Sequence, residues 1–382
     1  MPDNKKKVLY IITKSDVGGA QKYIADLSEN IDKNRFEAKK VFGGVDIKHL
    51  SNKTSPFTLF INDWLAIFEM VSFFKKEAPD IVHLNSSKAG VLGSLAGFLY
   101  NLVNSKKLKI VFTAHGWIFN PQNKISYLEK IFYASLHKMS SFFQDAIINV
   151  SNYDKEIALQ YKIARSNKLF TVWNGVDPKI SFLSKEDARK EIIARVSNGK
   201  IIRSENNIWI GSIGRLVKEK DYQTLIMSAK KVDTANFFII GDGYEKEKLI
   251  KLIASESLQD KFFIITPQGK DSKLLKAFDI FVLSSVKEGL PYTLIEAMAS
   301  ETPIIATKTG GITEILKGED GKNNGILVPI KSPETISQSI HSLLKDSNLR
   351  KSLIKNAKDF MKENLTLEKM VKETESIYQQ IS

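Results

Sequence analysis

The 382-residue sequence contains no cysteine, which excludes a disulfide scaffold and any zinc site built on thiolates. Its five histidines do not have the spacing of metal ligands, and no Asp-x-Asp motif is present, so we expect neither a metal nor a cofactor. No apolar stretch approaches the roughly 18 residues of a membrane span. The apolar run VLYII near the start is too short for a signal peptide. These absences together favour a cytoplasmic protein.

Positive charge is unevenly distributed along the chain. The net charge is +13, and residues 1–177 hold 24 lysines and arginines against 16 aspartates and glutamates. Between residues 101 and 144, six lysines accompany a single acid, Glu129. A basic surface of this kind suits nucleic acid, anionic lipid or phosphorylated small molecules, or it is simply a solvated lysine-rich face. Composition alone does not choose among these interpretations.

Short apolar runs alternate with amphipathic helical patterns, such as residues 20–31 and 87–103, along the whole chain. Apolar strands separated by helices are typical of parallel sheets that are covered on both faces. Two such series predict an α/β protein with two doubly wound, Rossmann-like parallel-sheet domains. The expected strands are 7–13, 36–43, 80–85, 109–115, 145–151 and 168–174 in the first series, and 207–214, 236–243, 261–267, 279–285, 302–307 and 325–330 in the second.

The predicted domain boundary lies within residues 174–190, where the strand pattern stops and a polar, proline-containing stretch begins. We therefore expect an N-terminal domain at residues 1–176 and a C-terminal domain at residues 177–364. The last helical pattern, residues 365–382, follows a complete second series. It is therefore expected to cross back to the first domain.

Two loops that follow predicted strands have the composition of anion sites. In TKSDVGGAQKY, Gly18 and Gly19 open a helix, so backbone can approach a ligand closely and helix N–H groups can face an anion. In IGSIGRLVKEKD, Arg215 and Lys220 place two cations before a helix, which suits a diphosphate. The alternatives are a tight turn for the glycine pair and an ordinary exposed loop for the two cations.

A third motif, EGLPYTLIEAMA, carries two acids at a helix entrance. Glu288 follows the end of a predicted strand, and Pro291 suits the first helical position, where no N–H is needed. Glu296 lies about one turn into the helix. A single acid at a helix start could simply complement the helix dipole, but this does not explain the second acid and the proline. The N–H groups expected to point free toward a ligand are those of Tyr292, Thr293 and Leu294.

These motifs, taken in order, resemble the retaining glycosyltransferases of glycosyltransferase family 4, which have the GT-B architecture of two Rossmann-like domains facing a cleft. The E-x7-E spacing of Glu288 and Glu296 is similar to the family's signature. The HLNSSKAG block resembles the version found in bacterial capsule and cell-surface polysaccharide transferases. The similarity covers nearly the whole chain, through VGGAQKY, HLNSSKAGVLG, FTAHGW, NVSNYDKE, VWNGVD, GRLVKEKD, IIGDGYEKEKL and TGGITE.

The resemblance implies a role for each motif. Glu296 would bind the ribose of the donor and Glu288 the transferred sugar, while Arg215 and Lys220 would neutralise the diphosphate. His115, in FTAHGW, would be an active-site histidine near the donor sugar; without the resemblance, a lone histidine is more often structural. The other donor-binding residues that the resemblance implies are Gly18, Gly19, Gly289, Leu290, Tyr292 and Thr293, and those bordering the acceptor cleft are Ser86, Ser87 and Lys88.

The implied reaction moves a sugar from a nucleotide-diphosphate donor, with UDP the expected carrier, to a lipid-linked or growing surface-polysaccharide acceptor, with retention of configuration. Metal independence is expected because two fixed cations could replace the charge of a metal. One alternative is a GT-B-like sugar-nucleotide 2-epimerase, which lacks this E-x7-E arrangement. The other is a basic nucleic-acid-binding protein, for which the sequence contains no recognised motif.

Residues 101–144 also interleave apolar side chains with their lysines. This mixture suits docking to the anionic inner face of the plasma membrane, where lipid-linked acceptors lie. The alternative is a core-facing amphipathic helix with a solvated back. The lysines expected to contact the membrane are Lys106, Lys107, Lys109, Lys124 and Lys130, and the apolar residues among them are Ile118, Phe119, Tyr127, Ile131, Phe132, Tyr133, Phe142 and Phe143.

Overall fold

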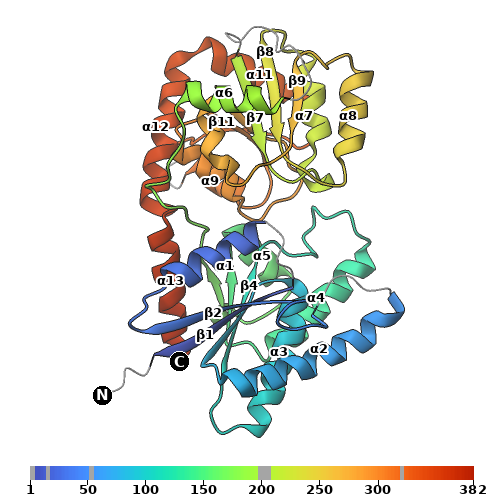
Figure 1. Ribbon diagram of the computed structural model, residues 1–382, viewed down its shortest axis with the longest axis vertical. Coiled ribbons are helices and arrows are strands. Elements are labelled where there is room, and N and C mark those ends of the chain that lie inside the picture. Colours follow the sequence, from blue (N-terminus) through green and yellow to red (C-terminus); the bar gives the residue numbers. More distant parts are fainter. Residues whose placement is uncertain (1–4, 14–17, 51–55, 197–207, 319–321) are drawn as a thin grey trace. The chain divides into compact units, whose positions relative to one another are not determined.

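The computed structural model describes residues 5–13, 18–50, 56–196, 208–318 and 322–382 of the chain (Figure 1). These residues form two compact units, which we call unit 1 and unit 2. Unit 1 comprises the described residues of Met1–Asn174 together with Leu367–Ser382, and unit 2 comprises those of Gly175–Thr366. The boundaries between the units therefore follow residues 174 and 366. The boundaries predicted from the sequence follow residues 176 and 364.

Unit 1 is built on a parallel sheet of six strands in the order β2-β1-β3-β4-β5-β6. Its strands β3 and β5 are wholly buried, because helices cover both faces of a parallel sheet. The six strands predicted for this half of the chain are confirmed. They are β1 (Lys6–Ile12), β2 (Phe36–Phe42), β3 (Ile81–Leu84), β4 (Lys109–Ala114), β5 (Ala146–Asn149) and β6 (Leu169–Thr171).

Right-handed crossovers place α1 on one face of this sheet and α2 to α5 on the other. Helices α2 and α4 both lie against α3, and the last helix of the chain, α13, lies against α1 (Figure 1). Tyr378 and Ile377 of α13 are buried in unit 1, although the whole of unit 2 separates them in sequence from the strands. The helices of unit 1 are α1 (Gly19–Asn30), α2 (Pro56–Glu77), α3 (Ser87–Val103), α4 (Tyr127–Ser141), α5 (Asn152–Gln160) and α13 (Leu367–Gln380), with a 3-10 turn at Ser166–Lys168.

Unit 2 repeats the scheme with a six-stranded parallel sheet in the order β12-β11-β10-β7-β8-β9. All six strands predicted for the second series are confirmed. They are β7 (Ile208–Ile213), β8 (Ala235–Ile240), β9 (Phe262–Ile265), β10 (Ile280–Leu283), β11 (Ile304–Thr307) and β12 (Ile326–Val328). The helices are α6 (Lys185–Arg195), α7 (Tyr222–Ala229), α8 (Lys246–Ser255), α9 (Tyr292–Ala299), α10 (Ile312–Lys317), α11 (Pro333–Lys345) and α12 (Ser347–Asn364), with 3-10 turns at Lys218–Lys220 and Asp271–Ala277.

The strand order of each sheet reverses once. In unit 1 the reversal lies between β1 and β3, and in unit 2 it lies between β7 and β10. At such a switch point the loops that follow the two strands diverge, and ligands of open α/β sheets bind in the crevice between them. The loops after these four strands are therefore where functional residues are expected.

Candidate active site

A lysine–glutamate pair lies at the switch point of unit 2. Lys220, in the 3-10 turn after β7, donates from Nζ to Oε1 of Glu288, in the loop after β10, at 2.6 Å. The hydroxyl of Ser285 donates to the same oxygen at 2.6 Å. The side chains of the pair are 15% and 12% exposed. Because both contacts are made to Oε1, a ligand hydroxyl can approach the carboxylate through Oε2.

The loops that carry this pair are fixed to each other. Ser284 Oγ donates to the backbone carbonyl oxygen of Lys220 at 2.9 Å, and the N–H of Val286 donates to the carbonyl oxygen of Glu219 at 2.8 Å. The pair is therefore preorganised, which is what stabilisation of a developing charge requires. The structure brings together Lys220 and Glu288, two residues that the sequence assigns to one site, and shows that they are ion-pair partners.

Helix α9 begins shortly after Glu288, as its motif predicts. Pro291 is the N-cap of α9, one position before the first helical residue. The N–H of Leu294 donates to the carbonyl oxygen of Pro291 at 3.1 Å, so the expectation that this N–H is free for a ligand is wrong. Glu296 lies one turn into the helix and is only 6% exposed. Both acids of the E-x7-E motif are thus held in one corner of unit 2.

The remaining donor-side candidates of unit 2 lie in the loop after β7, in the loop before α9 and in the first turn of α9. Gly289 and Leu290 are buried in the loop before α9, and Tyr292 is buried in its first turn. The hydroxyl of Thr293 is buried and has no hydrogen-bond partner among the residues that the structure describes. Arg215, directly after the loop glycine that follows β7, is exposed, so its guanidinium group can reach a bound anion.

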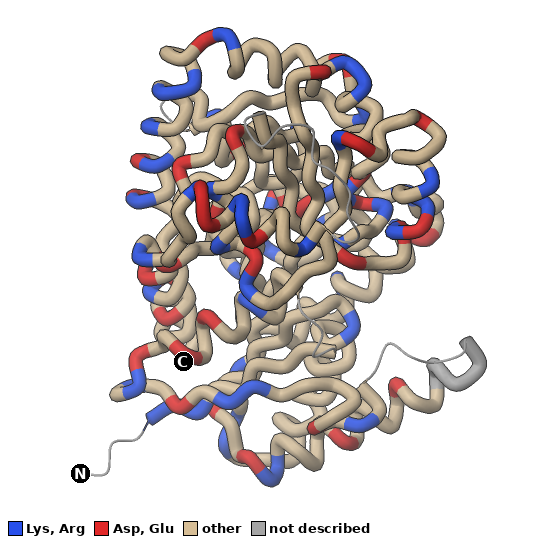
Figure 2. The backbone as a smooth tube through the Cα atoms, turned by 45° about the horizontal axis from the view of Figure 1, so that its top comes forward, with Lys and Arg blue, Asp and Glu red and all other residues tan. Residues whose placement is uncertain are grey.

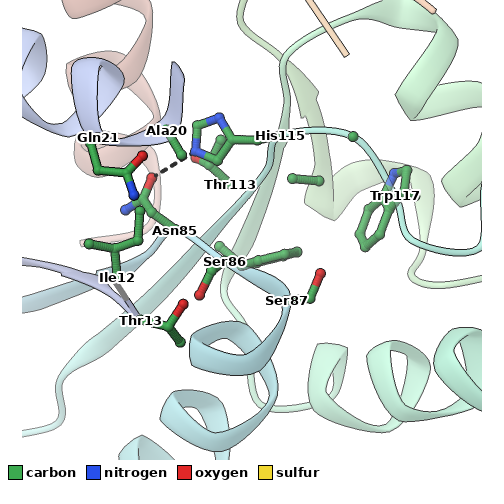
Figure 3. Close-up of a pocket in the computed structure, with 13 residues that line it drawn as sticks. Ile12, Thr13, Ala20, Gln21, Asn85, Ser86, Ser87, Thr113, His115 and Trp117 are labelled. Atoms are coloured by element: carbon green, nitrogen blue, oxygen red, sulfur yellow. Dashed lines mark hydrogen bonds between the residues drawn. The ribbon is translucent and has the colours of Figure 1, made fainter. Parts of the chain in front are cut away.

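A pocket of about 200 Å³ lies at the switch point of unit 1. Polar groups converge on it from α1 and from the ends of β1, β3 and β4, as Figure 3 shows. Its lining is formed by Ile12, Thr13, Ala20, Gln21, Asn85, Ser86, Ser87, Phe112, Thr113, Ala114, His115, Gly116 and Trp117.

His115 lines this pocket directly after β4. Its Nε2 lies 3.3 Å from Oδ1 of Asn85. The ring of Tyr23 meets the ring of His115 at a centroid distance of 4.9 Å and an interplanar angle of 78°. Burial lowers the pKa of His115 to about 3, so the imidazole is neutral at physiological pH. A neutral imidazole donates a hydrogen bond through one nitrogen and accepts one through the other.

The acceptor-side candidates lie at the start of α3. Ser86 and Ser87 both line the pocket, but the hydroxyl of Ser86 also caps α3 by accepting from the N–H of Ala89 at 3.3 Å. Lys88 forms an ion pair with Asp63 of α2 at 2.6 Å. Ser87 is therefore the candidate whose hydroxyl is best placed for a ligand.

The glycine pair begins α1. Gly18 is the N-cap of this helix and Gly19 is its first residue. Gly18 has a φ of −173°, an extended conformation that any residue adopts. Residues 14–17 of the same motif lie outside the described part of the chain.

Several residues of the two sites are not selected by their motifs. Asn85 directly precedes the candidate serines, and Ser285 ends a predicted strand, so a polar residue at the carboxyl end of a strand is a signal that could have identified both. Thr113 and Gln21 also line the pocket of unit 1. Thr113 stands in an apolar strand, and nothing in its neighbourhood in the sequence distinguishes it.

Two Rossmann-like units with candidate sites at their switch points are the architecture of the GT-B class of glycosyltransferases. Comparison with protein families agrees with this class. The description "Glycosyltransferase Family 4" matches residues 17–180, and "Glycosyl transferases group 1" matches residues 197–360. The two models cover most of the chain, which belongs to this family of glycosyltransferases.

Curated relatives include enzymes of bacterial surface polysaccharides. The chain is 25% identical over 346 residues to the capsular polysaccharide biosynthesis glycosyltransferase CapM of Staphylococcus aureus, covering 87% of this chain and 85% of the relative. It is 26% identical over 329 residues to the UDP-Gal:alpha-D-GlcNAc-diphosphoundecaprenol alpha-1,3-galactosyltransferase of Escherichia coli, covering 83% and 80%.

Solved structures show the same fold at low sequence identity. The Anabaena protein Alr3699/HepE in complex with UDP and glucose superposes with a TM-score of 0.77 at 17% identity, covering 98% of this chain and 99% of that one. Sucrose-phosphate synthase from Thermosynechococcus elongatus superposes with a TM-score of 0.82 at 16% identity, covering 99% of each. The GT-B fold predicted from the sequence is therefore confirmed.

Proposed function

We propose that this glycosyltransferase takes a sugar from a UDP-sugar and transfers it, with retention of configuration, to a lipid-linked or growing surface-polysaccharide acceptor. The observation that carries the proposal is the preorganised Lys220–Glu288 pair at the switch point of unit 2, with Glu288 eight residues before the buried Glu296. Two comparisons support it. The Escherichia coli relative is named for a UDP-sugar donor and a diphosphoundecaprenol acceptor, and the Anabaena structure contains UDP and glucose.

In the proposed mechanism Glu296 binds the ribose hydroxyls, Glu288 binds the transferred sugar, and Arg215 and Lys220 bind the diphosphate. The bond between the anomeric carbon and the diphosphate oxygen breaks while the acceptor oxygen attacks the same face of the sugar. The proton of the acceptor hydroxyl passes to the leaving diphosphate. Fixed cations stabilise the negative charge that develops there, and we propose that they do so without a metal ion.

The test is a panel of nucleotide sugars that vary in base and in sugar, measured for binding and for slow hydrolysis, with and without a chelator. A UDP-sugar is expected to give the tightest binding and the fastest hydrolysis, unchanged by chelation. Transfer to a diphosphate-linked polyprenol is then followed by NMR, in which the anomeric coupling of the product reports retention or inversion. Binding of no nucleotide sugar at all would overturn the proposal.

Arg215→Ala is expected to weaken binding of UDP by roughly 1.5–3 kcal/mol, the range for hydrogen bonds to charged groups. Lys220→Ala is expected to cost at least as much, because it also leaves the Glu288 carboxylate without its cation. Titration calorimetry measures both. Arg165→Ala, which removes one exposed arginine of unit 1, serves as the control, and equal UDP affinity in all three variants would exclude the diphosphate role.

His115→Ala is expected to fold normally and to bind UDP like the wild type, but to lose roughly ten-fold or more in turnover, because a hydrogen bond to the reacting sugar is removed. The measurement combines circular dichroism, UDP titration and the transfer rate. His341→Ala in α11 is the matched control. Full activity of the His115 variant would make this histidine a structural residue.

We further propose that unit 1 docks on an anionic membrane surface, where a lipid-linked acceptor would lie. No helix in the part of the chain described here combines the length and the apolarity that crossing a bilayer requires. Helices α2 and α4, which both contact α3 (Figure 1), carry apolar side chains that are exposed among the described residues. The exposed residues are Ile61, Trp64, Leu65 and Phe68 on α2, Tyr127, Leu128, Ile131, Phe132 and Met139 on α4, and Phe142 directly after α4.

The structure changes which of the predicted lysines suit this role. Lys106 pairs with Asp80 at 2.7 Å, and Lys109 pairs with Asp145 at 3.3 Å. Both lie at the amino end of β4, whereas the pocket lies at the carboxyl end. Basic and acidic residues are interspersed along most of the backbone (Figure 2), so most lysines have acidic residues near them in the chain. Lys124 is exposed and lies in the segment between the carboxyl end of β4 and α4, so by position it and the exposed apolar residues of α2 and α4 are the better candidates for membrane contact.

The apolar residues predicted for membrane contact also differ in their exposure. Tyr127, Ile131, Phe132 and Phe142 are exposed. Phe119, by contrast, is wholly buried and belongs to the core of unit 1, so its predicted place at the membrane is wrong. The partly buried residues that pack against this core are Ile118, Tyr133 and Phe143.

The wild-type protein is expected to sediment with liposomes that contain anionic lipid at low salt and to be released at high salt, because each engaged lysine contributes about 1 kcal/mol. Leu128→Ser with Phe132→Ser, or Lys124→Glu with Lys130→Glu, is expected to weaken sedimentation. The triple variant Lys106→Glu, Lys107→Glu, Lys109→Glu is expected to have a smaller effect. A wild-type protein that ignores anionic liposomes would favour a soluble acceptor.

A further inference from the structure

The orientation of Asn85 determines where His115 carries its hydrogen. Nδ2 of Asn85 donates to the backbone carbonyl oxygen of His83 at 2.9 Å. A carbonyl oxygen can only accept, so the amide nitrogen is fixed on that side, and Oδ1 faces Nε2 of His115 at 3.3 Å (Figure 3). Because Oδ1 also can only accept, Nε2 must carry the hydrogen. Nδ1 of His115 is then the unprotonated nitrogen.

The backbone that anchors this amide is held by a buried network. His83 Nε2 lies 2.6 Å from Oγ1 of Thr113, and His83 Nδ1 lies 2.5 Å from Oη of Tyr378 in α13. The network extends to Tyr10 Oη, 3.2 Å from Tyr378, and to Tyr23 Oη, 3.3 Å from Thr113. All five residues are wholly buried. Because Tyr378 donates to Tyr10, it accepts from Nδ1 of His83, and Nε2 of His83 accepts from Thr113. The network joins β1, β3, β4, α1 and α13 below the pocket.

No charged group contributes to the protonation of His115 within the described residues. The titratable groups that face it are Tyr23 from α1 and His83 from β3. Burial raises the pKa of Tyr23 to about 12 and lowers the pKa of His83 to about 3, so both are uncharged at neutral pH. Lys88, at the start of the neighbouring α3, is already paired with Asp63. Among the described residues, therefore, no charged group near His115 stabilises an imidazolium.

We propose that Asn85 is a positioning residue for sugar transfer: it holds His115 as the neutral Nε2–H tautomer, so that Nδ1 accepts a hydrogen bond from a hydroxyl group of the bound sugar. This inference rests on the proposed role of His115 in transfer. Positive charge develops on the sugar ring as the bond to the diphosphate breaks. A neutral acceptor orients the sugar without opposing that charge, whereas an imidazolium would oppose it.

The first test needs neither donor nor activity. In the ¹⁵N-labelled wild-type protein, two-bond ¹⁵N–¹H correlations distinguish the two neutral tautomers and the imidazolium, and the loss of one signal set in His115→Gln assigns the residue. We expect the Nε2–H tautomer, unchanged from about pH 5 to about pH 8, the range in which an ordinary histidine titrates. An Nδ1–H tautomer, or an imidazolium that titrates in this range, would overturn the proposal.

The second test uses Asn85→Asp, which keeps the shape of the side chain but places a carboxylate beside Nε2. A neighbouring carboxylate favours the imidazolium and raises the pKa of His115. We expect the activity of the variant, divided by that of the wild type, to fall about ten-fold or more from about pH 8 to about pH 5, with the KM for the donor nearly unchanged. Asn34→Asp makes the same change at an exposed turn of unit 1 and is expected to leave this ratio flat.

The two tests separate the inference from the proposed function. If His115 has the Nε2–H tautomer but His115→Ala retains full activity, the proposed role of His115 fails while the tautomer assignment stands. If Asn85→Asp lowers activity equally at all pH values, Asn85 is a structural residue and the positioning role is wrong.

Discussion

Glu288→Gln is expected to lower the turnover of sugar transfer on the order of 100-fold or more while leaving the affinity for free UDP nearly unchanged. Glu288 is proposed to bind the transferred sugar, which free UDP lacks. Glutamine keeps the size of the side chain but removes the negative charge that Lys220 and Ser285 hold in place at 2.6 Å. The proposed contact between Glu288 and the transferred sugar is therefore weakened in the transition state, where it would contribute most to the rate.

Glu296→Gln is the matched variant, because it makes the same chemical change in the other acid of the motif. Its proposed partner is the ribose, which donor and UDP share. We expect UDP to bind more weakly by roughly 1.5–3 kcal/mol in this variant and turnover at saturating donor to fall less than in Glu288→Gln. Calorimetric titration with UDP and steady-state kinetics measure the two effects. An equal loss of UDP affinity in both variants would contradict this division of roles.

The ion pair adds a second expectation for Glu288→Gln. In the proposed mechanism the ammonium group of Lys220, which pairs with Glu288 in the wild-type protein, would be shared with the bound diphosphate. Without the carboxylate, Lys220 interacts with the diphosphate alone, so the affinity for UDP should stay constant or rise. A fall in UDP affinity in this variant would mean that Glu288 positions Lys220 for the diphosphate rather than binding the sugar.

The strands of both sheets could be predicted because parallel sheets bury both faces. A fully buried strand such as β10 (Ile280–Leu283) is a continuous apolar run, and the helices between the runs are amphipathic. The polar residues at strand ends, Glu288 among them, could be predicted because parallel strands place their carboxyl ends at one edge. These features depend on local sequence and on a general rule of the fold.

The partners of these residues could not be predicted in the same way. Lys220 and Glu288 are 68 residues apart and meet because β7 and β10 are neighbours in the sheet, an order that the apolar pattern does not contain. His83 and Tyr378 are separated by 295 residues and meet because α13 returns to unit 1. Hydrogen bonds between side chains depend on such tertiary neighbours and on rotamers, which leave no periodic signal in the sequence.

The helix entrance shows the same limit on a smaller scale. The motif around Pro291 predicts a helix start and a set of free N–H groups, and α9 does begin there. A shift of one residue makes Pro291 the N-cap, and its carbonyl oxygen then accepts from Leu294. Propensity places a helix terminus only to within one or two residues, whereas the identity of the free N–H groups changes with a shift of one.

Among substitutions of a glycine by alanine in unit 2, Gly310→Ala is expected to cause the largest loss of stability. Gly310 has a φ of +50°, and a Cβ at this position would lie 1.9 Å from the backbone carbonyl oxygen of Glu288 and 3.0 Å from that of Gly289. The next N–H, of Gly311, donates to Gly289 at 2.7 Å, so the two loops cannot separate without losing this bond. The left-handed conformation costs about 1–2 kcal/mol and the displaced backbone about 1–3 kcal/mol.

Gly269→Ala is the matched control for this prediction. Gly269 also has a positive φ, +84°, but a Cβ there would meet no atom within 4 Å. It should therefore lose only the conformational part, about 1–2 kcal/mol, and keep normal turnover. Gly310→Ala should lose about 2–5 kcal/mol in urea unfolding of unit 2 and most of its turnover even where it remains folded, because the displaced backbone carries Glu288. Equal stability losses in the two variants, with turnover intact in both, would show that the loop around Glu288 yields to the methyl group and is not held in a single conformation.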